Sequence, residues 1–442
     1  MLCLGIWLHA ADSLVTATIA PAIVDDIGGV AFINWTIALY QVGAIVAGAA
    51  APAACERLGI KRVLELAALI YGSGCIIAAL APTMTLLLAG RLAQGIGGGI
   101  LLSLCYLAIQ QWFAQAWWSR LFGIVAVIWG AGSLLGPLIG GIFAGLHAWR
   151  STFLLFAGQA ALLWLMAAVW LPADDRSSRA TRPWTVLPLL ILSAATILIA
   201  ASGVATLLIV SVAECLLGAA LLYLAARLDF HSHSRMFPIQ VLDLRHPIGV
   251  GLMMVFALSA ATCGFWAYGP LILKVLFGTR PLISGYVLAV EAVAWSLATL
   301  AVSTAPLSAD RWLIRVGACL IALGAGGFTW AVPQGSLTGI VLCALLQGLG
   351  FGLCWPSIVH RLARFSDEAE RALAVSSPET MQRIGYAVGA AAVGIAANLS
   401  GLAHGISIAA VKSAAFWVFA AFIPILIFAL VCAWQFTREP AP

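Results

Sequence analysis

Charged side chains are scarce in this sequence. Asp, Glu, Lys and Arg make up 9% of the 442 residues, and apolar residues make up 63%. Soluble domains contain about 25% charged and about 45–50% apolar residues. This composition excludes an ordinary soluble domain and indicates an integral membrane protein. The net charge of +5 does not indicate nucleic-acid binding, because the basic residues are spread over the breaks between apolar runs and form no patch or tail.

Several motifs of covalent and redox chemistry are also missing. The sequence has no GxxxxGK[ST] phosphate loop, no GxSxG and no HExxH, so we expect no ATP-driven step and no enzyme activity. Its ten cysteines form no CxxC pair and no Cys/His cluster, so we expect no bound metal and no cofactor. Alternating strand patterns are absent too, which argues against a β-barrel. The remaining interpretation is a set of membrane-spanning helices.

Long apolar runs predict fourteen spans, since a helix needs about 20 mostly apolar residues to cross a bilayer. The spans are residues 2–24, 35–54, 63–81, 85–111, 120–145, 152–171, 184–203, 206–226, 247–273, 282–304, 312–331, 336–358, 377–400 and 412–436. With the N-terminus inside, sixteen basic residues fall in inner loops and four in outer loops. This bias follows the positive-inside rule and predicts that both termini are cytoplasmic.

One short motif occurs twice. QGIGGG at residues 94–99 returns as QGLGFG at residues 347–352, 253 residues later. An Arg with a carboxylate beside it precedes each copy, at Glu56-Arg57 and at Asp310-Arg311. Two features in register indicate an internal duplication, which is common in transporters and places the working site between the copies.

The length of the offset predicts the domain organisation. Six spans with their loops occupy about 171 residues, so two adjoining six-helix halves would repeat at much less than 253. The excess matches an insertion. We therefore predict an N-terminal six-helix bundle at residues 1–171, an inserted two-helix segment with cytoplasmic linkers at 172–246, and a C-terminal six-helix bundle at 247–442.

Five Asp, Glu or Arg residues lie clearly inside the predicted spans, away from their ends: Asp12, Arg91, Glu214, Glu291 and Arg383. A charge at a helix centre costs about 2.5–3.5 kcal/mol, so each is a functional candidate. Asp12 either takes up a proton when it is removed from water or makes a structural hydrogen bond. Arg91 keeps its charge and either finds a partner or extends to the membrane surface. Glu214 is expected to form a structural pair within the insertion, and Arg383 to extend to the surface.

Aromatic residues surround Glu291 in the sequence. Trp295 follows it by one helical turn, and Trp266 and Tyr268 lie in the preceding span. A carboxylate beside aromatic faces suits an organic cation. The alternative is an aromatic packing residue beside a Glu that has its own structural partner.

Small residues mark one face of the fifth span. Gly132, Gly136 and Gly140 recur every four residues, with Pro137 between them and Gly141 at the end. This spacing lets two helix backbones approach closely, and a proline can bend the span. The face therefore serves close packing alone, or it also takes part in a conformational change.

A charged cluster follows the second span. It consists of Glu56, Arg57, Gly59, Lys61 and Arg62, and Asp310 and Arg311 occupy the corresponding loop of the second half. A carboxylate and cations at such a turn can bridge neighbouring helix ends and hold one of two conformations. The alternative is that the cations only set the topology.

These segments resemble the major facilitator superfamily, in particular its fourteen-helix drug:proton antiporter branch. RLAQGIG at residues 91–97 matches the Arg-x-x-Gln-Gly-x-Gly pattern of that superfamily, and GSLLGPLIGG at residues 132–141 matches its exporter pattern. ADSLVTATIAP at residues 11–21 keeps the Asp and Pro of the branch's first helix. PAACERLGIKR at residues 52–62 fits the superfamily's loop pattern Gly-x-x-x-Asp-Arg-x-Gly-Arg-Arg at Arg57, Gly59, Lys61 and Arg62.

The resemblance implies a proton-driven exporter of drug-like, amphiphilic or cationic molecules in the cytoplasmic (inner) membrane, in which two bundles rock around a central cavity. No cofactor is implied beyond the proton gradient, and a monomer is sufficient. The proton-coupling candidates are Asp12, Arg91 and Glu291; the substrate-cavity candidates are Glu291, Trp295, Trp266, Tyr268 and Gln94. An exporter of one endogenous metabolite, such as a sugar, an amino acid or a natural product, and a non-transporting membrane sensor remain alternatives.

Overall fold

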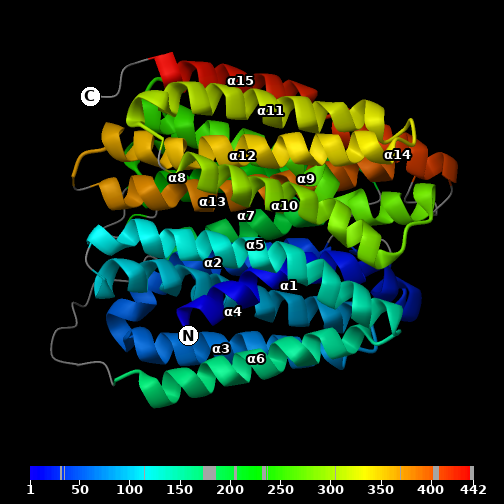
Figure 1. Ribbon diagram of the computed structural model, residues 1–442, viewed down its shortest axis with the longest axis horizontal. Helices are drawn as coiled ribbons and strands as arrows, with labels where there is room; N and C mark the ends of the chain where they lie inside the picture. Colours follow the sequence, from blue (N-terminus) through cyan, green and yellow to red (C-terminus); the bar gives the residue numbers. More distant parts are fainter. Residues whose placement is uncertain are drawn as a thin grey trace. The chain divides into compact units, whose positions relative to one another are not determined.

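In the computed structural model, every regular element of the described residues is helical (Figure 1). The described residues are 1–29, 32–33, 35–113, 115–172, 186–203, 207–230, 235, 237–303, 305–368, 370–401 and 408–438. The helices are α1 Leu2–Ile27, α2 Trp35–Leu58, α3 Ile60–Ala79, α4 Met84–Trp112, α5 Gln115–Gly145, α6 Trp149–Trp170, α7 Val186–Ser202, α8 Leu208–Phe230, η3 Ile239–Leu242, α9 Pro247–Phe277, α10 Pro281–Val302, η4 Leu307–Ala309, α11 Asp310–Ala331, α12 Leu337–Phe365, α13 Arg371–Leu399, α14 Ile408–Ala420 and α15 Ile423–Arg438.

Local signals in the sequence set several helix ends. Gly59, with a φ of 84°, separates α2 from α3, and Gly278 ends α9 in the left-handed conformation, which glycine adopts without steric cost. Ser336 caps α12 by accepting a hydrogen bond from the Gly339 amide. Between such breaks the chain stays helical, because a helix satisfies all its backbone hydrogen bonds within one segment and apolar surroundings offer no other partner.

Eleven of the described helical segments are long and apolar enough to cross a membrane. Helix α1 makes twelve if its parts Leu2–Asp12 and Leu14–Ile27, which are bent by 40° to one another, count as one span. Each of the fourteen predicted spans overlaps a helix, and the last corresponds to α14 and α15 together. The apolar part of α7 is shorter, at Leu187–Ser202, and α13 does not pass the same test. The count of fourteen spans therefore stays a prediction.

The chain forms two compact units. The first comprises residues 1–193 and 280–286, and the second comprises residues 194–279 and 287–442. The first unit contains α1 to α6, and the second contains α8, α9, α11 to α15 and most of α10. The bundle boundaries predicted at residues 171 and 246 stay a prediction.

Both units have the same internal arrangement, as the repeated motif predicts. In the first unit α4 packs against α2 and α3, α5 against α1, and α6 against α3. In the second unit α12 packs against α11, α13 against α9, and both α14 and α15 against α11. The pairing of third with fourth, first with fifth and third with sixth helix thus occurs twice, which supports an internal duplication.

Two close glycine contacts align the two halves of this repeat with single-residue precision. A Cβ on Gly95 would lie 2.1 Å from the Tyr40 carbonyl oxygen, and one on Gly348 would lie 2.0 Å from the Glu291 carbonyl oxygen. The two glycines are the 253-residue repeat partners on α4 and α12. Tyr40 on α2 and Glu291 on α10 therefore occupy corresponding positions.

From Ala194 onward, the described part of the insertion packs within the second unit. The backbone of Gly203 lies against Ala391 and Gly394 of α13, and the Asn398 side-chain amide donates to the Gly203 carbonyl at 3.2 Å. Near the end of α8, the buried Asp229 accepts a hydrogen bond from the Phe237 amide. Most of the predicted linker before α7, at residues 173–185, lies outside the described residues, as do residues 231–234 and 236 of the linker after α8.

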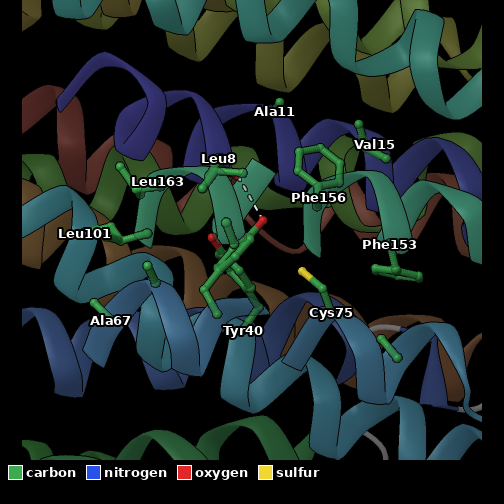
Figure 2. Packing of buried hydrophobic residues seen from close by; sticks show 14 of the residues in the cluster. Leu8, Ala11, Val15, Tyr40, Ala67, Cys75, Leu101, Phe153, Phe156 and Leu163 are labelled. Atoms are coloured by element: carbon green, nitrogen blue, oxygen red, sulfur yellow. Dashed lines mark hydrogen bonds between the residues drawn. The ribbon is translucent and has the colours of Figure 1, made fainter. Parts of the chain in front are cut away.

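A dense apolar core fills the first unit. Leu8, Tyr40, Cys75 and Phe156 come from α1, α2, α3 and α6 and converge in it (Figure 2). Such packing leaves little room for side-chain motion. It therefore fixes the positions of the few polar side chains that share this core.

Candidate functional site

A buried ion pair lies in the first unit. Arg91 on α4 and Asp12 on α1 are each 1% exposed. Nη1 of Arg91 donates to both carboxylate oxygens of Asp12, at 3.0 and 2.8 Å. Both residues were predicted separately as candidates, and the structure brings them together. The alternative that Arg91 extends to the membrane surface is wrong for this structure, because its guanidinium is buried.

Further contacts complete the surroundings of the Arg91 guanidinium. It donates to Oε1 of Gln94, one helical turn later on α4, at 2.7 Å, and to the Thr36 carbonyl at 3.0 Å. It also lies 4.5 Å from the centre of the Tyr40 ring, a cation–π distance. An arginine cannot lose its charge in a protein. The cluster therefore holds a permanent cation, and the Asp12 carboxylate in contact with it is a group that can change charge.

Two residues that the sequence did not single out support this cluster from α3. The Cys75 thiol accepts a hydrogen bond from Nε2 of Gln94 at 3.0 Å, and the Tyr71 side chain interacts with Asp12. The Tyr71 hydroxyl also donates to the Leu8 carbonyl at 3.2 Å. Gln94, predicted as a substrate-cavity residue, is 0% exposed and holds Arg91 in place.

The second unit contains a different buried cluster at the equivalent place. Glu291 on α10 is 2% exposed and accepts a hydrogen bond from Nε2 of Gln347 on α12 at 2.8 Å. Its other oxygen, Oε2, and Oε1 of Gln347 are both buried without a hydrogen-bond partner. No lysine or arginine of the described chain forms an ion pair with Glu291. The site therefore presents two buried acceptor oxygens that lack a donor.

The positions equivalent to the ion pair hold alanines in the second unit. Ala344 lies 253 residues after Arg91, and the glycine contacts of α13 with α9 place Ala257 at the position of Asp12. Both alanines are buried. The duplicated framework therefore carries a paired carboxylate in one unit and a carboxylate without a cation in the other.

The three aromatic residues predicted to surround Glu291 have different contacts in the structure. The Trp266 side chain interacts with the Glu291 carboxyl group. Trp295 is half-buried and stacks on Phe351 of α12, with ring centres 4.6 Å apart. Tyr268 is buried on α9. Whether these residues bind a substrate stays a prediction.

The loop cluster of the first unit forms one well-defined contact. Lys61 Nζ donates to the carbonyls of Ala168 and Leu171, both at 2.8 Å, and so ties the start of α3 to the end of α6. Gly59 supplies the turn, Arg57 and Arg62 are exposed, and the Glu56 side chain lies outside the described residues.

The equivalent cluster of the second unit uses other residues. Asp310 is buried, with Oδ2 lacking a hydrogen-bond partner, and Arg311 is exposed. Here Arg315 donates to the Thr437 hydroxyl at 2.8 Å and Arg361 to the Phe436 carbonyl at 2.8 Å. In both units a cation near the start of the third helix, Lys61 or Arg315, thus holds the end of the sixth.

The predicted glycine face of α5 packs closely on α1. A Cβ on Gly132, Gly136 or Gly140 would lie 3.0–3.2 Å from side-chain atoms of that helix. Pro137 is buried within α5, and Gly141 lies close to Leu282. The helix that carries Asp12 is therefore held at short range along this face. A part of the face in the direction of transport stays a prediction.

The two remaining intramembrane charges have different surroundings. Arg383 is 8% exposed and forms an ion pair with Glu379 one turn earlier on α13, at 2.9 Å, so it has a partner instead of extending to the surface. Glu214 on α8 has one buried oxygen without a hydrogen-bond partner, and the structural pair expected for it is not observed in the described residues.

Comparison with known proteins identifies the family. A sequence profile described as Major Facilitator Superfamily matches residues 2–309. The chain belongs to this superfamily. It is therefore an integral membrane transporter of small molecules and not an enzyme. The described helices beyond residue 309 complete, together with α9 and α10, the repeat of the first half.

The similar proteins with curated descriptions are transporters. Two probable multidrug-efflux transporters of Mycobacterium tuberculosis, from strains CDC 1551 and H37Rv, are 28% identical over 408 residues, covering 89% of this chain and 86% of theirs. A multidrug efflux pump of Staphylococcus aureus strain N315 is 22% identical and covers 66% of each chain.

Solved structures share the fold at low sequence identity. A D-xylose–proton symporter has a TM-score of 0.70 at 15% identity, covering 100% of this chain and 97% of that chain. A nucleoside transporter has a TM-score of 0.67 at 12% identity, covering 99% and 98%. These likenesses show the fold alone.

Proposed function

We propose that this chain is a proton-coupled exporter of drug-like cationic or amphiphilic molecules that works by alternating access. The proposal rests on the different surroundings of the buried carboxylates in the two units. One unit buries a carboxylate against a permanent cation, and the other buries a carboxylate beside acceptor oxygens that lack a donor. The proposal includes fourteen spans in the cytoplasmic membrane with both termini in the cytoplasm, and a monomer suffices.

Asp12 is the proposed proton carrier. When it is ionised, its charge compensates that of Arg91 at 2.8 Å. When it takes up a proton, the attraction is lost and the guanidinium keeps only Gln94, Thr36 and the Tyr40 ring as partners. A buried charge without its counter-charge is costly. Proton uptake therefore favours a rearrangement of α1 against α4, which is the kind of two-state change that alternating access needs.

Glu291 is the proposed anchor for the positive charge of a substrate. Its free oxygen and that of Gln347 are both acceptors, so a cation or a hydrogen-bond donor would satisfy two buried groups at once. The Trp266 side chain interacts with the same carboxyl group, so its indole ring would lie beside an organic cation bound there. The names of the mycobacterial and staphylococcal relatives support multidrug efflux as the activity.

Energy comes from the proton gradient in this proposal, and no cofactor takes part. The test uses proteoliposomes with an imposed proton gradient and three probes: a quaternary ammonium dye, a sugar and an amino acid. The proposal predicts that the dye is moved and that a protonophore stops the movement. Movement of only the sugar or amino acid would favour an exporter of one metabolite. No movement of any probe, with the protein correctly inserted, would favour a non-transporting sensor.

A further inference from the structure

A histidine lies beside the ion pair in the first unit. His9 is 2% exposed and precedes Asp12 by three residues on α1, so both side chains lie on the same helix face. Nδ1 of His9 and the Tyr40 hydroxyl are 2.7 Å apart, and the edge of the Trp129 ring faces the imidazole at 5.8 Å. His9 is therefore fixed in position by α2 and α5.

Tyr40 connects this histidine to the arginine. Its hydroxyl contacts His9, and its ring lies 4.5 Å below the Arg91 guanidinium carbon. A Cβ on Gly98 of α4 would meet the Tyr40 hydroxyl at 2.6 Å and Nδ1 of His9 at 3.2 Å. Position 98 thus needs a glycine, because any side chain would occupy the space of this hydrogen bond. The close approach of α4 therefore leaves just enough room for the His9–Tyr40 hydrogen bond, which argues against a contact made by incidental packing.

We propose that His9 is a second proton-carrying residue of the transport cycle, and that Tyr40 is its positioning residue. This inference rests on the proposed proton coupling. When the neutral imidazole carries its hydrogen on Nε2, Nδ1 accepts the Tyr40 hydroxyl hydrogen. A proton that arrives at Nδ1 gives an imidazolium, which then donates to the Tyr40 oxygen while the hydroxyl hydrogen turns to another acceptor. The same proton leaves Nδ1 when the neutral form returns.

The charges around His9 couple its proton to that of Asp12. Asp12 lies one turn from His9 on α1, and Tyr40 contacts His9 from α2. Arg91 of α4 contacts both Tyr40 and Asp12, and Tyr71 of α3 interacts with Asp12. The ring contact from α5 is the neutral Trp129. An imidazolium one turn from Asp12 stabilises the ionised carboxylate and competes with Arg91 for it. A substrate-driven movement of α1 would therefore change the proton affinity of both groups together.

The chain offers near-isosteric variants for the test. His9→Asn keeps an acceptor oxygen close to the position of Nδ1 but cannot take up a proton. Tyr40→Phe keeps the ring beneath Arg91 and removes only the hydroxyl. His360→Asn, at an exposed position of α12, is the matched control. Elution as a single species and the melting temperature in detergent establish that each variant is folded.

The measurement is proton release on addition of a saturating quaternary ammonium probe, in weakly buffered detergent solution. Histidine changes charge between about pH 5 and 8, so the comparison is made at about pH 6 and about pH 8. We expect His9→Asn to release about half as many protons as wild type at the lower pH and about the same number at the higher pH. His360→Asn should equal wild type at both.

Two results would overturn the inference. If His9→Asn, folded and binding the probe, releases as many protons as wild type at both pH values, His9 carries no proton. If Tyr40→Phe leaves the pH dependence of release unchanged, Tyr40 does not position His9. The proposed function fails separately: wild-type protein that binds the probe without releasing protons at either pH is not proton-coupled.

Discussion

The two halves of this transporter share a backbone arrangement but differ in what they bury at its centre. The first half places Asp12 and Arg91 in a pair whose charges cancel. The second half has alanines at the equivalent positions and places Glu291 where the first half has Tyr40. Gln94 and Gln347 remain in register and contact the functional carboxylate or its partner in both.

The difference shows how one duplicated framework can hold two kinds of site. A paired carboxylate responds to protons, because its neutral form leaves a buried cation without a counter-charge. A carboxylate beside unsatisfied acceptors responds to donors and cations that arrive from outside. We infer that duplication supplied the close helix contacts, and that later substitutions at a few buried positions separated the two tasks.

The largest expected effect tests what the halves share. Gly95→Ala and Gly348→Ala should each prevent folding, since the new methyl group would lie 2.1 or 2.0 Å from a carbonyl oxygen of the neighbouring helix. Gly326→Ala on α11 is the control, because nothing lies within 4 Å of the place its methyl group would take and alanine favours a helix. Yield of folded protein and melting temperature in detergent measure the effect. A folded variant at only one of the two positions would break the equivalence of the repeats.

Much of the fold could be predicted from the sequence because span length and charge bias are local properties. Helix ends were less predictable. Helix α12 continues to Phe365, beyond the predicted residue 358, and α13 begins at Arg371, before the predicted 377. Both extensions add polar residues, which a search for apolar runs leaves out although the helix continues through them.

The candidate site could be predicted only in part. Asp12, Arg91 and Glu291 stood out because charge is rare within spans. Their partners did not, since helix periodicity shows which face a residue occupies but not which helix lies opposite. His9 and Tyr40 were missed for this reason. The spacing of three residues between His9 and Asp12 was the one signal in the sequence that could have indicated His9.

The second prediction breaks the ion pair. Asp12→Asn keeps the shape of the side chain but leaves Arg91 buried without a counter-charge, which costs about 3–5 kcal/mol of stability. Gradient-driven efflux should be lost. The double variant with Arg91→Gln should recover the melting temperature but not the efflux. Efflux at the wild-type rate in Asp12→Asn would show that the proton is carried elsewhere.

The third prediction changes the other carboxylate. Glu291→Gln breaks no ion pair and can still accept from Gln347, so the melting temperature should stay the same or rise. Affinity for a cationic probe should fall about tenfold or more, equivalent to about 1.4 kcal/mol, whereas that for a neutral probe should change little. Binding titrations with a cationic and an uncharged analogue of similar shape measure this. An equal loss for both would contradict a role in charge recognition.

The smallest expected effect concerns the insertion. Glu214 lies on α8, which has no counterpart in the repeat and contacts α13 and η3 among the described helices. Glu214→Gln should therefore leave efflux and its proton dependence unchanged within a factor of about two. Complete loss of coupling in this variant, at normal expression, would place the insertion in the transport path.

Proton release on substrate binding tests the central comparison most directly. Purified wild type, Asp12→Asn and Glu291→Gln are each given a quaternary ammonium probe at a saturating concentration for that variant. At about pH 8, where His9 makes no contribution to the release, the account predicts proton release from wild type and from Glu291→Gln, because Asp12 remains in both, and little release from Asp12→Asn. Release from Asp12→Asn at the wild-type level, with none from Glu291→Gln, would contradict the account and exchange the roles of the two halves.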